Sequence, residues 1–338
     1  MNNKFITSKL FVLAFGFAVF SFLLISCNKR LSSSGGRNIT FVEGLIPKAE
    51  QIILGALAED NPFIKTKAIE AVGSTHRGEL MKKVTKLLTD ENVPVRYSAA
   101  LAAGNTKYKI AKSNLERLLS DENKNVRIAA AYALYKIGDG DMINFIRKAI
   151  ISNDQTVRAN ATFLMGECGD KNSLKLLYRV MREESSEYKV SLQAAQAIAK
   201  LGDEEIYAKL WTMLISTYAD VRVMGIRGMG ALGTLESKNA LIRMLDDPIL
   251  EVRLAAAEQL GMLNDNIAEP EVLDVFEKNL TADMDKEARQ RVNVLTAMAI
   301  GQIGTESLTG FLPQLLDDSS KLVRIAAAKA VFQCSNQK

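Results

Sequence analysis

The apolar positions of this chain follow a helical spacing that recurs about every thirty-one residues. In the stretch NVRIAAAYALYKIGD, which begins at Asn125, Ala130 and Leu134 are four residues apart and therefore lie on one face of a helix. Related stretches begin at Thr156, Asp220, Glu251 and Leu322. In five repeats this helix is followed by a glycine, which adopts the left-handed conformation that ends helices. These glycines are Gly138, Gly169, Gly202, Gly233 and Gly304.

A second amphipathic segment follows each of these helices, for example AKSNLERLLS from Ala111 and SLKLLYRVMR from Ser173. A short polar turn then leads to the next repeat, and its aspartate and asparagine side chains can cap the helix that follows. No stretch alternates between apolar and polar residues as a half-buried strand does. Because one helix pair cannot bury both of its faces, neighbouring pairs must stack. The sequence therefore predicts an all-α protein, a right-handed α-solenoid (an alpha-alpha superhelix) of about nine helix pairs over residues 43–338.

An arginine stands near the start of the first helix in most repeats, and in four of them an aspartate precedes it by six residues. We interpret these side chains as structural, because a charge that recurs once in every layer is what the stacking of layers requires. Each arginine is expected to reach a carboxylate or a carbonyl group of the adjacent repeat, and ligand binding is the alternative. In two repeats Ser191 and Asn293 replace the arginine. The members of this predicted ladder are Arg96, Arg127, Arg158, Arg222, Arg253, Arg324, Asp90, Asp121, Asp247 and Asp318.

The repeated aspartate–arginine spacing resembles that of the HEAT-repeat family, in a short form similar to the repeats of phycobilin lyases. The resemblance covers nearly all of residues 47–334. It implies that the arginines and aspartates join one repeat to the next. It also implies that the second helices line the concave side of the solenoid, which is the usual binding surface. Deoxyhypusine hydroxylase, an enzyme of this fold class, holds iron with His-Glu pairs, and this chain contains no such pair.

Cations recur in register along the second helices of five of the first six repeats, ten residues before the arginine position of the next repeat once the two-residue insertion before Ser191 is allowed for. The fifth repeat has Thr212 at this position. The apolar residues of the same helices fall on the opposite face. We therefore expect a basic row that attracts an acidic partner. The alternative is that each cation only offsets the dipole at the C-terminal end of its helix. The predicted partner-binding residues are Lys86, Arg117, Lys148, Arg179 and Arg243, with Lys82 and Lys175 one helical turn earlier.

Residues 1–26 have the pattern of a secretory signal peptide, in which Lys4 and Lys9 precede an uncharged run. The stretch LLISC, which ends at Cys27, resembles the lipobox of bacterial lipoproteins. The resemblance implies that the signal is removed, that Cys27 receives a diacylglycerol, and that the protein is anchored to the cell envelope outside the cytoplasm. An uncleaved anchor helix is the alternative, although the run is shorter than the ~20 residues that a membrane span needs.

The segment after the cysteine contains serine, glycine and charged residues, which cannot bury a core. We expect residues 27–42 to form a flexible tether. Asn28 follows the cysteine in place of the aspartate that retains enterobacterial lipoproteins on the inner membrane. In a cell with two membranes this favours the outer membrane.

The composition contains little that could support catalysis. The chain has one histidine, His76, and three cysteines, which cannot supply a multi-histidine metal site or a nucleophile with its base. We therefore expect no catalytic residue, metal, cofactor or small-molecule substrate. A net charge of +4 also lacks the strongly basic balance of most nucleic-acid-binding domains.

These observations favour a lipid-anchored, non-catalytic envelope scaffold or adaptor that binds a partner protein on its concave helical surface. One alternative is a binding module for an anionic envelope polymer or lipid headgroup, and another is a lyase-type enzyme subunit. If the basic row does not bind, the next candidate surface is the outer helices or the uncapped end around Val331 and Phe332. Cys334 lies near that end, where we expect it to be exposed.

Overall fold

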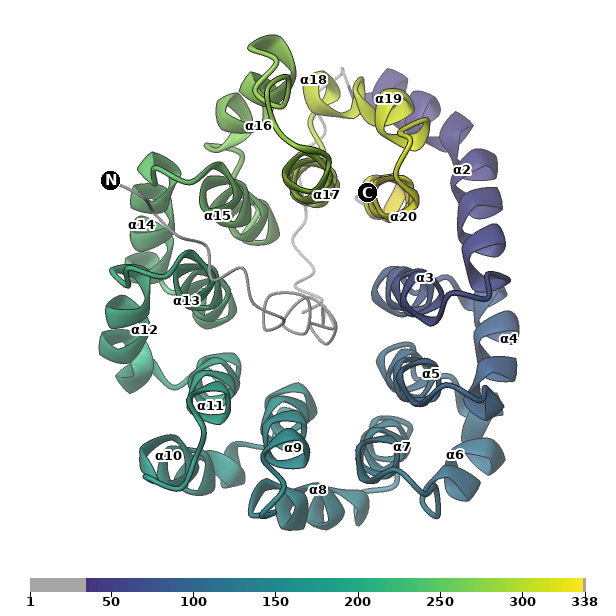
Figure 1. Ribbon diagram of the computed structural model, residues 1–338, viewed down its shortest axis with the longest axis vertical. Coiled ribbons are helices and arrows are strands. Elements are labelled where there is room, and N and C mark those ends of the chain that lie inside the picture. The colour runs from purple at the N-terminus through teal and green to yellow at the C-terminus, as the bar shows by residue number, and fades with distance from the viewer. Residues whose placement is uncertain (1–34, 337–338) are drawn as a thin grey trace. The chain divides into compact units, whose positions relative to one another are not determined.

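The computed structural model describes residues 35–336 and contains only helices and turns within that range (Figure 1). The predicted signal peptide and Cys27 lie outside the described residues. The prediction of an all-α solenoid of stacked helix pairs is confirmed. None of the described helices has the length and apolar character that a membrane span requires.

Each repeat consists of a first helix and a shorter second helix, as the sequence pattern predicts. The first helices are α3 (Pro62–Thr75), α5 (Val93–Asn105), α7 (Lys124–Lys136), α9 (Gln155–Cys168), α11 (Tyr188–Lys200), α13 (Ala219–Leu232), α15 (Leu250–Met262), α17 (Lys286–Ile303) and α20 (Lys321–Asn336). The second helices are α4 (Gly78–Lys86), α6 (Lys112–Leu118), α8 (Met142–Ile150), α10 (Leu174–Arg182), α12 (Tyr207–Leu214), α14 (Leu235–Arg243) and α16 (Glu269–Glu277), and in the last pair α18 (Glu306–Thr309) with α19 (Leu312–Leu316). Single 3-10 turns flank five of the second helices: η1 (Leu87–Thr89), η2 (Lys109–Ala111), η3 (Lys171–Ser173), η4 (Glu204–Ile206) and η5 (Met244–Asp246).

The described chain divides into two compact units. Unit 1 runs from Val72 to Ser237 and contains the repeats from α4 to α13. Unit 2 joins the chain before residue 72 to residues 238–338, so that it contains both ends of the described chain.

The first helices of unit 1 approach one another closely because small residues lie at their contacts. A Cβ atom added to Gly73 would lie 2.9 Å from the Cα of Ala102, and one added to Gly166 would lie 2.8 Å from the Cα of Ala197. The second helices instead pack with bulky side chains, of which Leu115 is an example. Small residues on one layer and large residues on the other bend the stack toward its first helices.

Figure 1 shows the result within unit 1, where α5, α7, α9 and α11 lie on the inner side and α6, α8 and α10 on the outer side. The expectation that the second helices line the concave side is therefore wrong for this unit. They form its convex side, because the alanine and glycine contacts between first helices shorten the inner layer. The predicted basic row follows the second helices, and in unit 1 it is thus convex as well.

Unit 2 contains a helix that the sequence analysis assigned partly to a tether. The first eight residues of helix α2 (Gly35–Leu57) fall within that predicted tether, and the helix packs against α20. On α2, Val42, Ala49 and Ile53 are buried. Their spacing of seven and four residues places them on one helical face, which covers the last repeat. The predicted tether of residues 27–42 therefore extends too far toward the C-terminus, because the segment is helical from Gly35 and its apolar face is buried.

The C-terminal end of the solenoid is covered, contrary to expectation. Val331 and Phe332 are fully buried, and Cys334 is only 9% exposed. Two ion pairs support the contact between the ends of the chain: Lys48 Nζ lies 2.6 Å from Asp317 Oδ1, and Lys321 Nζ lies 2.5 Å from Glu59 Oε1. The prediction of an uncapped end failed because α2, which is not part of any repeat, supplies the missing apolar face.

Eleven positions after the arginine position, the backbone has positive φ in every described repeat except the last, whether or not the residue is glycine. Besides the five glycines, His76, Lys107 and Asn264 have φ values of 54°, 50° and 58° at this position. The requirement comes from the turn between the two helices of a repeat, and glycine meets it with the least strain.

Candidate functional site

Arg96 and Asp121 form the best-developed contact of the predicted ladder. Arg96 Nε donates to Asp121 Oδ2 at 2.8 Å and its Nη2 donates to Asp121 Oδ1 at 3.0 Å, which is a two-point contact between consecutive repeats. Both side chains are at most 10% exposed. Burial alone would raise the pKa of Asp121, but the hydrogen bonds from Arg96 and from the Asn123 amide hold it below its ordinary value.

The ladder arginines share a contact with the turn that precedes their own helix. In five of them Nη1 donates to the backbone carbonyl of the residue six positions earlier, at 2.6–3.0 Å. The five are Arg96, Arg127, Arg222, Arg253 and Arg324. Arg158 instead pairs with the Glu183 carboxylate. Where Asn293 replaces arginine, its Nδ2 donates to Asp318 Oδ2 at 3.1 Å, twenty-five residues ahead, as Arg96 does to Asp121.

The carboxylates of the four ladder aspartates bind within the turns that precede their own arginines. Each carboxylate accepts the backbone N–H of the residue two positions later, at 2.7–2.9 Å, which shapes the turn. The aspartates with this bond are Asp90, Asp121, Asp247 and Asp318. The six-residue spacing between aspartate and arginine therefore arises because the arginine binds the backbone carbonyl of the aspartate. The aspartate carboxylate instead accepts the backbone N–H of its turn and, in Asp121, also the arginine of the preceding repeat. This geometry fits a structural role.

A second polar ladder lies on the first helices, nine residues after the arginine position, and the sequence analysis missed it. Lys200 Nζ lies 2.5 Å from Glu167 Oε1, and Lys136 Nζ donates to the Glu167 carbonyl oxygen at 3.2 Å. The three residues follow one another at the repeat interval with alternating charge, which is the signal that could have identified them. Glu167 is buried, so this contact joins three repeats rather than forming an exposed site.

The basic row divides between the two units. Lys86, Arg117, Lys148 and Arg179 lie in the last turns of α4, α6, α8 and α10 of unit 1, and all four are exposed. Lys82 and Lys175, one turn earlier, are exposed too. Within residues 35–336 none of these six cations forms an ion pair or a side-chain hydrogen bond. Arg243, also exposed, belongs to unit 2. The four cations of unit 1 are hereafter the basic row.

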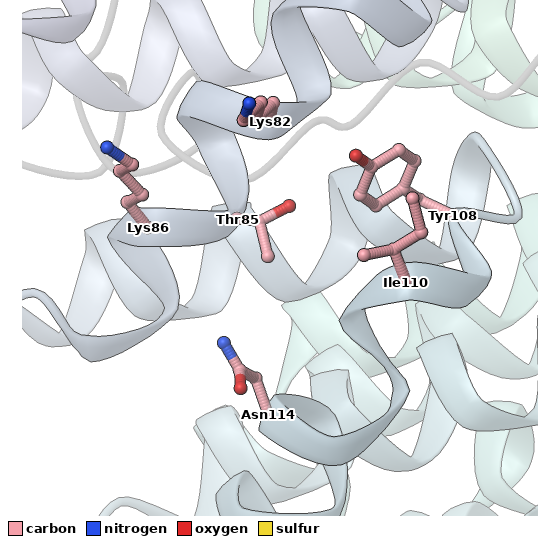
Figure 2. A pocket seen from close by; sticks show the side chains of 6 residues that line it. All are labelled: Lys82, Thr85, Lys86, Tyr108, Ile110 and Asn114. Carbon is pink, nitrogen blue, oxygen red and sulfur yellow. The ribbon is translucent and has the colours of Figure 1, made fainter.

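An open pocket of about 140 Å³ lies at the beginning of the basic row, between α4 and α6 (Figure 2). Its lining consists of Lys82, Thr85, Lys86, Tyr108, Ile110 and Asn114. Two of these residues are cations from the sequence prediction, and no lining residue is acidic. Ile110 is 79% exposed, more than any other large apolar side chain of the described residues. The sequence analysis did not identify this pocket, because its members come from three short elements.

The nucleophilic and titratable groups of the described chain are dispersed. Cys168 and Cys334 are free and buried, and burial raises the pKa of each thiol to about 12. His76 is exposed in the first inter-helix turn. Across the described part of the chain, no group of three or more histidine, cysteine, aspartate or glutamate side chains is arranged to hold a metal ion.

Comparison with known proteins shows similarity to one repeat family. A family profile described as HEAT repeats matches residues 81–158, 143–223 and 209–296, which together exceed half of the chain. The phycocyanobilin lyase subunit alpha of Picosynechococcus sp. is 29% identical over 114 residues, which is 33% of this chain and 42% of that subunit. The match thus spans less than half the length of that relative.

Two solved structures are similar to this chain at low identity. The complex of CpcE and CpcF of phycocyanin lyase from Nostoc sp. is 16% identical, with a TM-score of 0.46 and coverage of 82% of this chain and 98% of that chain. Human deoxyhypusine hydroxylase in complex with glycerol is 17% identical, with a TM-score of 0.37 and coverage of 78% and 98%. Similarity at this level carries no information about ligands or activity.

Proposed function

Because this chain belongs to the HEAT-repeat family, we propose that it is a non-catalytic scaffold whose basic row binds an acidic protein partner. The supporting observation is that Lys86, Arg117, Lys148 and Arg179 are exposed, in register and unpaired within the described residues. The ladder cation Arg96, by contrast, is paired with Asp121 of the next repeat. One exposed cation in each of four successive repeats creates a continuous positive electrostatic potential, which attracts an acidic surface.

The dimensions of the basic row favour an extended partner. Neighbouring helices of a solenoid are about 8–10 Å apart, so four repeats place the outer cations roughly 30 Å from each other. That length exceeds what a small anion can bridge. Exposed charges of this kind accelerate encounter and set specificity more than they add affinity, and salt screens them.

The second part of the proposal is that the scaffold is held at a membrane surface in the cell envelope by a lipid on Cys27. Support comes from the lipobox-like stretch that ends at this cysteine. Seven residues lie between Cys27 and Gly35, the first residue of α2, and the eight residue-to-residue steps span at most about 29 Å when extended. A lipidated cysteine would therefore hold unit 2 close to the bilayer. Stable anchoring needs more than one acyl chain, which lipoprotein processing supplies.

The experiment is capture of envelope proteins from detergent-solubilised membranes by the purified protein, compared with a variant carrying Arg117→Glu, Lys148→Glu and Arg179→Glu. We expect the variant to lose the captured chain while it unfolds at an unchanged denaturant concentration. The matched control reverses three other exposed lysines, Lys124, Lys171 and Lys286, and should retain capture. Equal capture by both variants, insensitive to added salt, would show that the basic row only offsets helix dipoles.

Two other functions predict different results in the same experiment. A module for an anionic envelope polymer or lipid headgroup would bind that polymer or anionic vesicles in a salt-sensitive way without any captured protein. An enzyme subunit of the lyase type would copurify with a pigment or transfer one to a second protein, which absorbance spectroscopy detects. The resemblance to the phycocyanobilin lyase subunit covers only a third of this chain and is the reason to include that measurement.

A further inference from the structure

We propose that the pocket between α4 and α6 is the anchor point for an acidic linear segment of the partner, which places one aliphatic or aromatic side chain against Ile110. This inference rests on the proposed function and adds to it the place of first contact and the chemistry of the bound segment. The pocket lies wholly within unit 1, and all of its lining residues are described.

Ile110 is the first indication, because the repeat itself does not require an apolar residue there. The residues at the same position in the five other repeats of unit 1 are polar, namely Glu79, Asp141, Asn172, Glu205 and Glu236, whereas the seventh repeat has Ile267 there. All of these sites lie at or just before the start of the second helix of a repeat, so a polar side chain is compatible with the fold. Ile110 is 79% exposed, so a ligand that covers it removes apolar area from water, which is favourable.

The charge around the pocket is the second indication. Lys82 and Lys86 stand on successive turns of α4 and line the pocket without an ion-pair partner among the described residues. The carboxylates on the flanking helices are already engaged. Glu79 Oε1 lies 3.6 Å from Arg77 Nη1, and Glu116 Oε1 lies 3.8 Å from Lys112 Nζ. The pocket therefore attracts carboxylates from elsewhere.

The polar groups at the rim suit a polypeptide. Figure 2 shows Tyr108 and Ile110 together on one side of the opening, Lys82, Thr85 and Lys86 along α4, and Asn114 on α6. The Thr85 hydroxyl already donates to the Met81 carbonyl at 2.7 Å. The Asn114 carboxamide forms no hydrogen bond within the described chain, so its N–H and C=O groups are available to a peptide backbone, which carries the complementary acceptor and donor.

The volume of the pocket limits which ligands can fit in it. Sites for small molecules usually enclose about 300–1,000 Å³. A volume of about 140 Å³ in an open pocket fits one side chain rather than a whole ligand. A polyanionic glycan could pair with the lysines but has no apolar side chain to cover Ile110. The combination of cations, one exposed isoleucine and a free carboxamide therefore favours an acidic peptide.

The test uses two fluorescein-labelled synthetic peptides made of aspartate and glutamate, one with a central phenylalanine and one with serine in its place. Binding to the purified protein is followed by fluorescence anisotropy. We expect the phenylalanine peptide to bind about tenfold more tightly, as burial of an aromatic side chain would provide. Ile110→Ser should abolish this preference and leave binding of the serine peptide unchanged. Lys82→Glu should weaken both peptides.

Ile110→Asp serves as a second variant, because Asp141 occupies the equivalent position and shows that the fold accepts it. Denaturant unfolding should be unchanged in each variant. The proposal is overturned if wild-type protein does not distinguish the two peptides, or if Ile110→Ser retains the distinction. Vesicles of phosphatidylglycerol are the further probe, and Lys82-dependent binding to them with no peptide binding would assign the pocket to a lipid headgroup and also overturn the proposal.

The experiments test the role of the pocket and the role of the basic row separately. Capture of the envelope partner that depends on Arg117, Lys148 and Arg179 but is unaffected by Ile110→Ser and Lys82→Glu would leave the scaffold function standing and reject the anchor. Loss of peptide discrimination in Ile110→Ser, with capture unaffected by reversal of the basic row, would support the anchor and reject the row.

Discussion

Asp121 accepts two hydrogen bonds from the guanidinium of Arg96, which lies twenty-five residues earlier in the preceding repeat, and none of its carboxylate contacts come from Arg127 of its own repeat. Arg127 reaches only the backbone carbonyls of Asp121 and Glu122. One aspartate thus joins two arginines through different groups. The carboxylate contact ties consecutive repeats together, and the carbonyl contact holds the turn in which it lies.

The first prediction concerns the energetic coupling of these residues. Asp121→Ala and Arg96→Ala should each lower the free energy of unfolding by about 1–3 kcal/mol, because each leaves a nearly buried charged partner unsatisfied. A double-mutant cycle in urea should give a coupling of about 1–2 kcal/mol between Arg96 and Asp121. The corresponding cycle between Arg127 and Asp121 should give a smaller coupling, because the charge of Arg127 acts on the Asp121 carboxylate without a side-chain hydrogen bond to it. Strong coupling in the second cycle would contradict the geometry described above.

The second prediction follows from the pKa of His76. Loss of solvation at the imidazole and the charge of nearby Lys107 both lower this pKa below its ordinary value. The unfolded chain therefore binds the proton more tightly than the folded chain. The resulting contribution to stability is present above about pH 6.5 and is lost as the pH falls through the folded-state pKa. His76→Asn removes the titration and keeps a residue that tolerates the left-handed backbone.

Urea unfolding of both proteins above and below that pH tests this expectation. The wild-type protein should lose more stability on acidification than His76→Asn does. Identical losses would mean that the pKa of His76 is the same in the folded and unfolded chains.

The third prediction concerns Lys107, which occupies a glycine position with φ of 50°. Lys107→Gly should raise the free energy of unfolding by about 1 kcal/mol, because a left-handed backbone costs a non-glycine residue about 1–2 kcal/mol and glycine recovers most of it. Gly169, with φ of 76° at the equivalent position, provides the reverse change. Gly169→Lys should destabilise by a similar amount. A stabilising effect of the second substitution would be incompatible with a strained turn.

The fourth prediction concerns the contact between α2 and α20. Ile53 is fully buried on α2, whereas its neighbour Leu54 is 40% exposed. Ile53→Ala should lower the free energy of unfolding of unit 2 by about 2–5 kcal/mol through loss of apolar burial and formation of a cavity. Leu54→Ala should change it by less than about 0.5 kcal/mol. Hydrogen exchange of α20 should increase in the first variant alone, and unaltered protection there would disprove that α2 covers this helix.

The fifth prediction concerns the anchor. Cys27→Ala should leave the precursor without lipid and shift the protein from the detergent phase to the aqueous phase in phase partitioning, because the sulfur that accepts the diacylglycerol is missing. Ser26→Ala, which keeps a small residue before the cysteine, is the matched control and should be processed normally. Normal processing and unchanged partitioning of Cys27→Ala would refute the lipoprotein proposal.

Much of the fold was predictable because its determinants are local. The four-residue apolar spacing within each first helix and the glycine of each inter-helix turn act within about a dozen residues of chain, and all appear where the sequence places them. Even Lys107 and His76 adopt the conformation that glycine predicts, because the turn dictates the backbone at that position. The basic row was likewise visible in the sequence, since its register follows directly from the repeat.

Other features depend on contacts between residues far apart in the chain, and only the tertiary structure decided them. By itself the sequence determined that helix pairs stack, and which residues recur in each layer. It did not determine the direction of curvature in unit 1, because that depends on how closely Gly73 and Ala102 bring two helices together. Nor did it determine that α2 covers α20, or that Asp121 serves Arg96 rather than Arg127. The repeat spacing in the sequence shows where each residue lies within its repeat. The residue or helix that it contacts depends on side-chain volume and on the distances between helices in the folded structure.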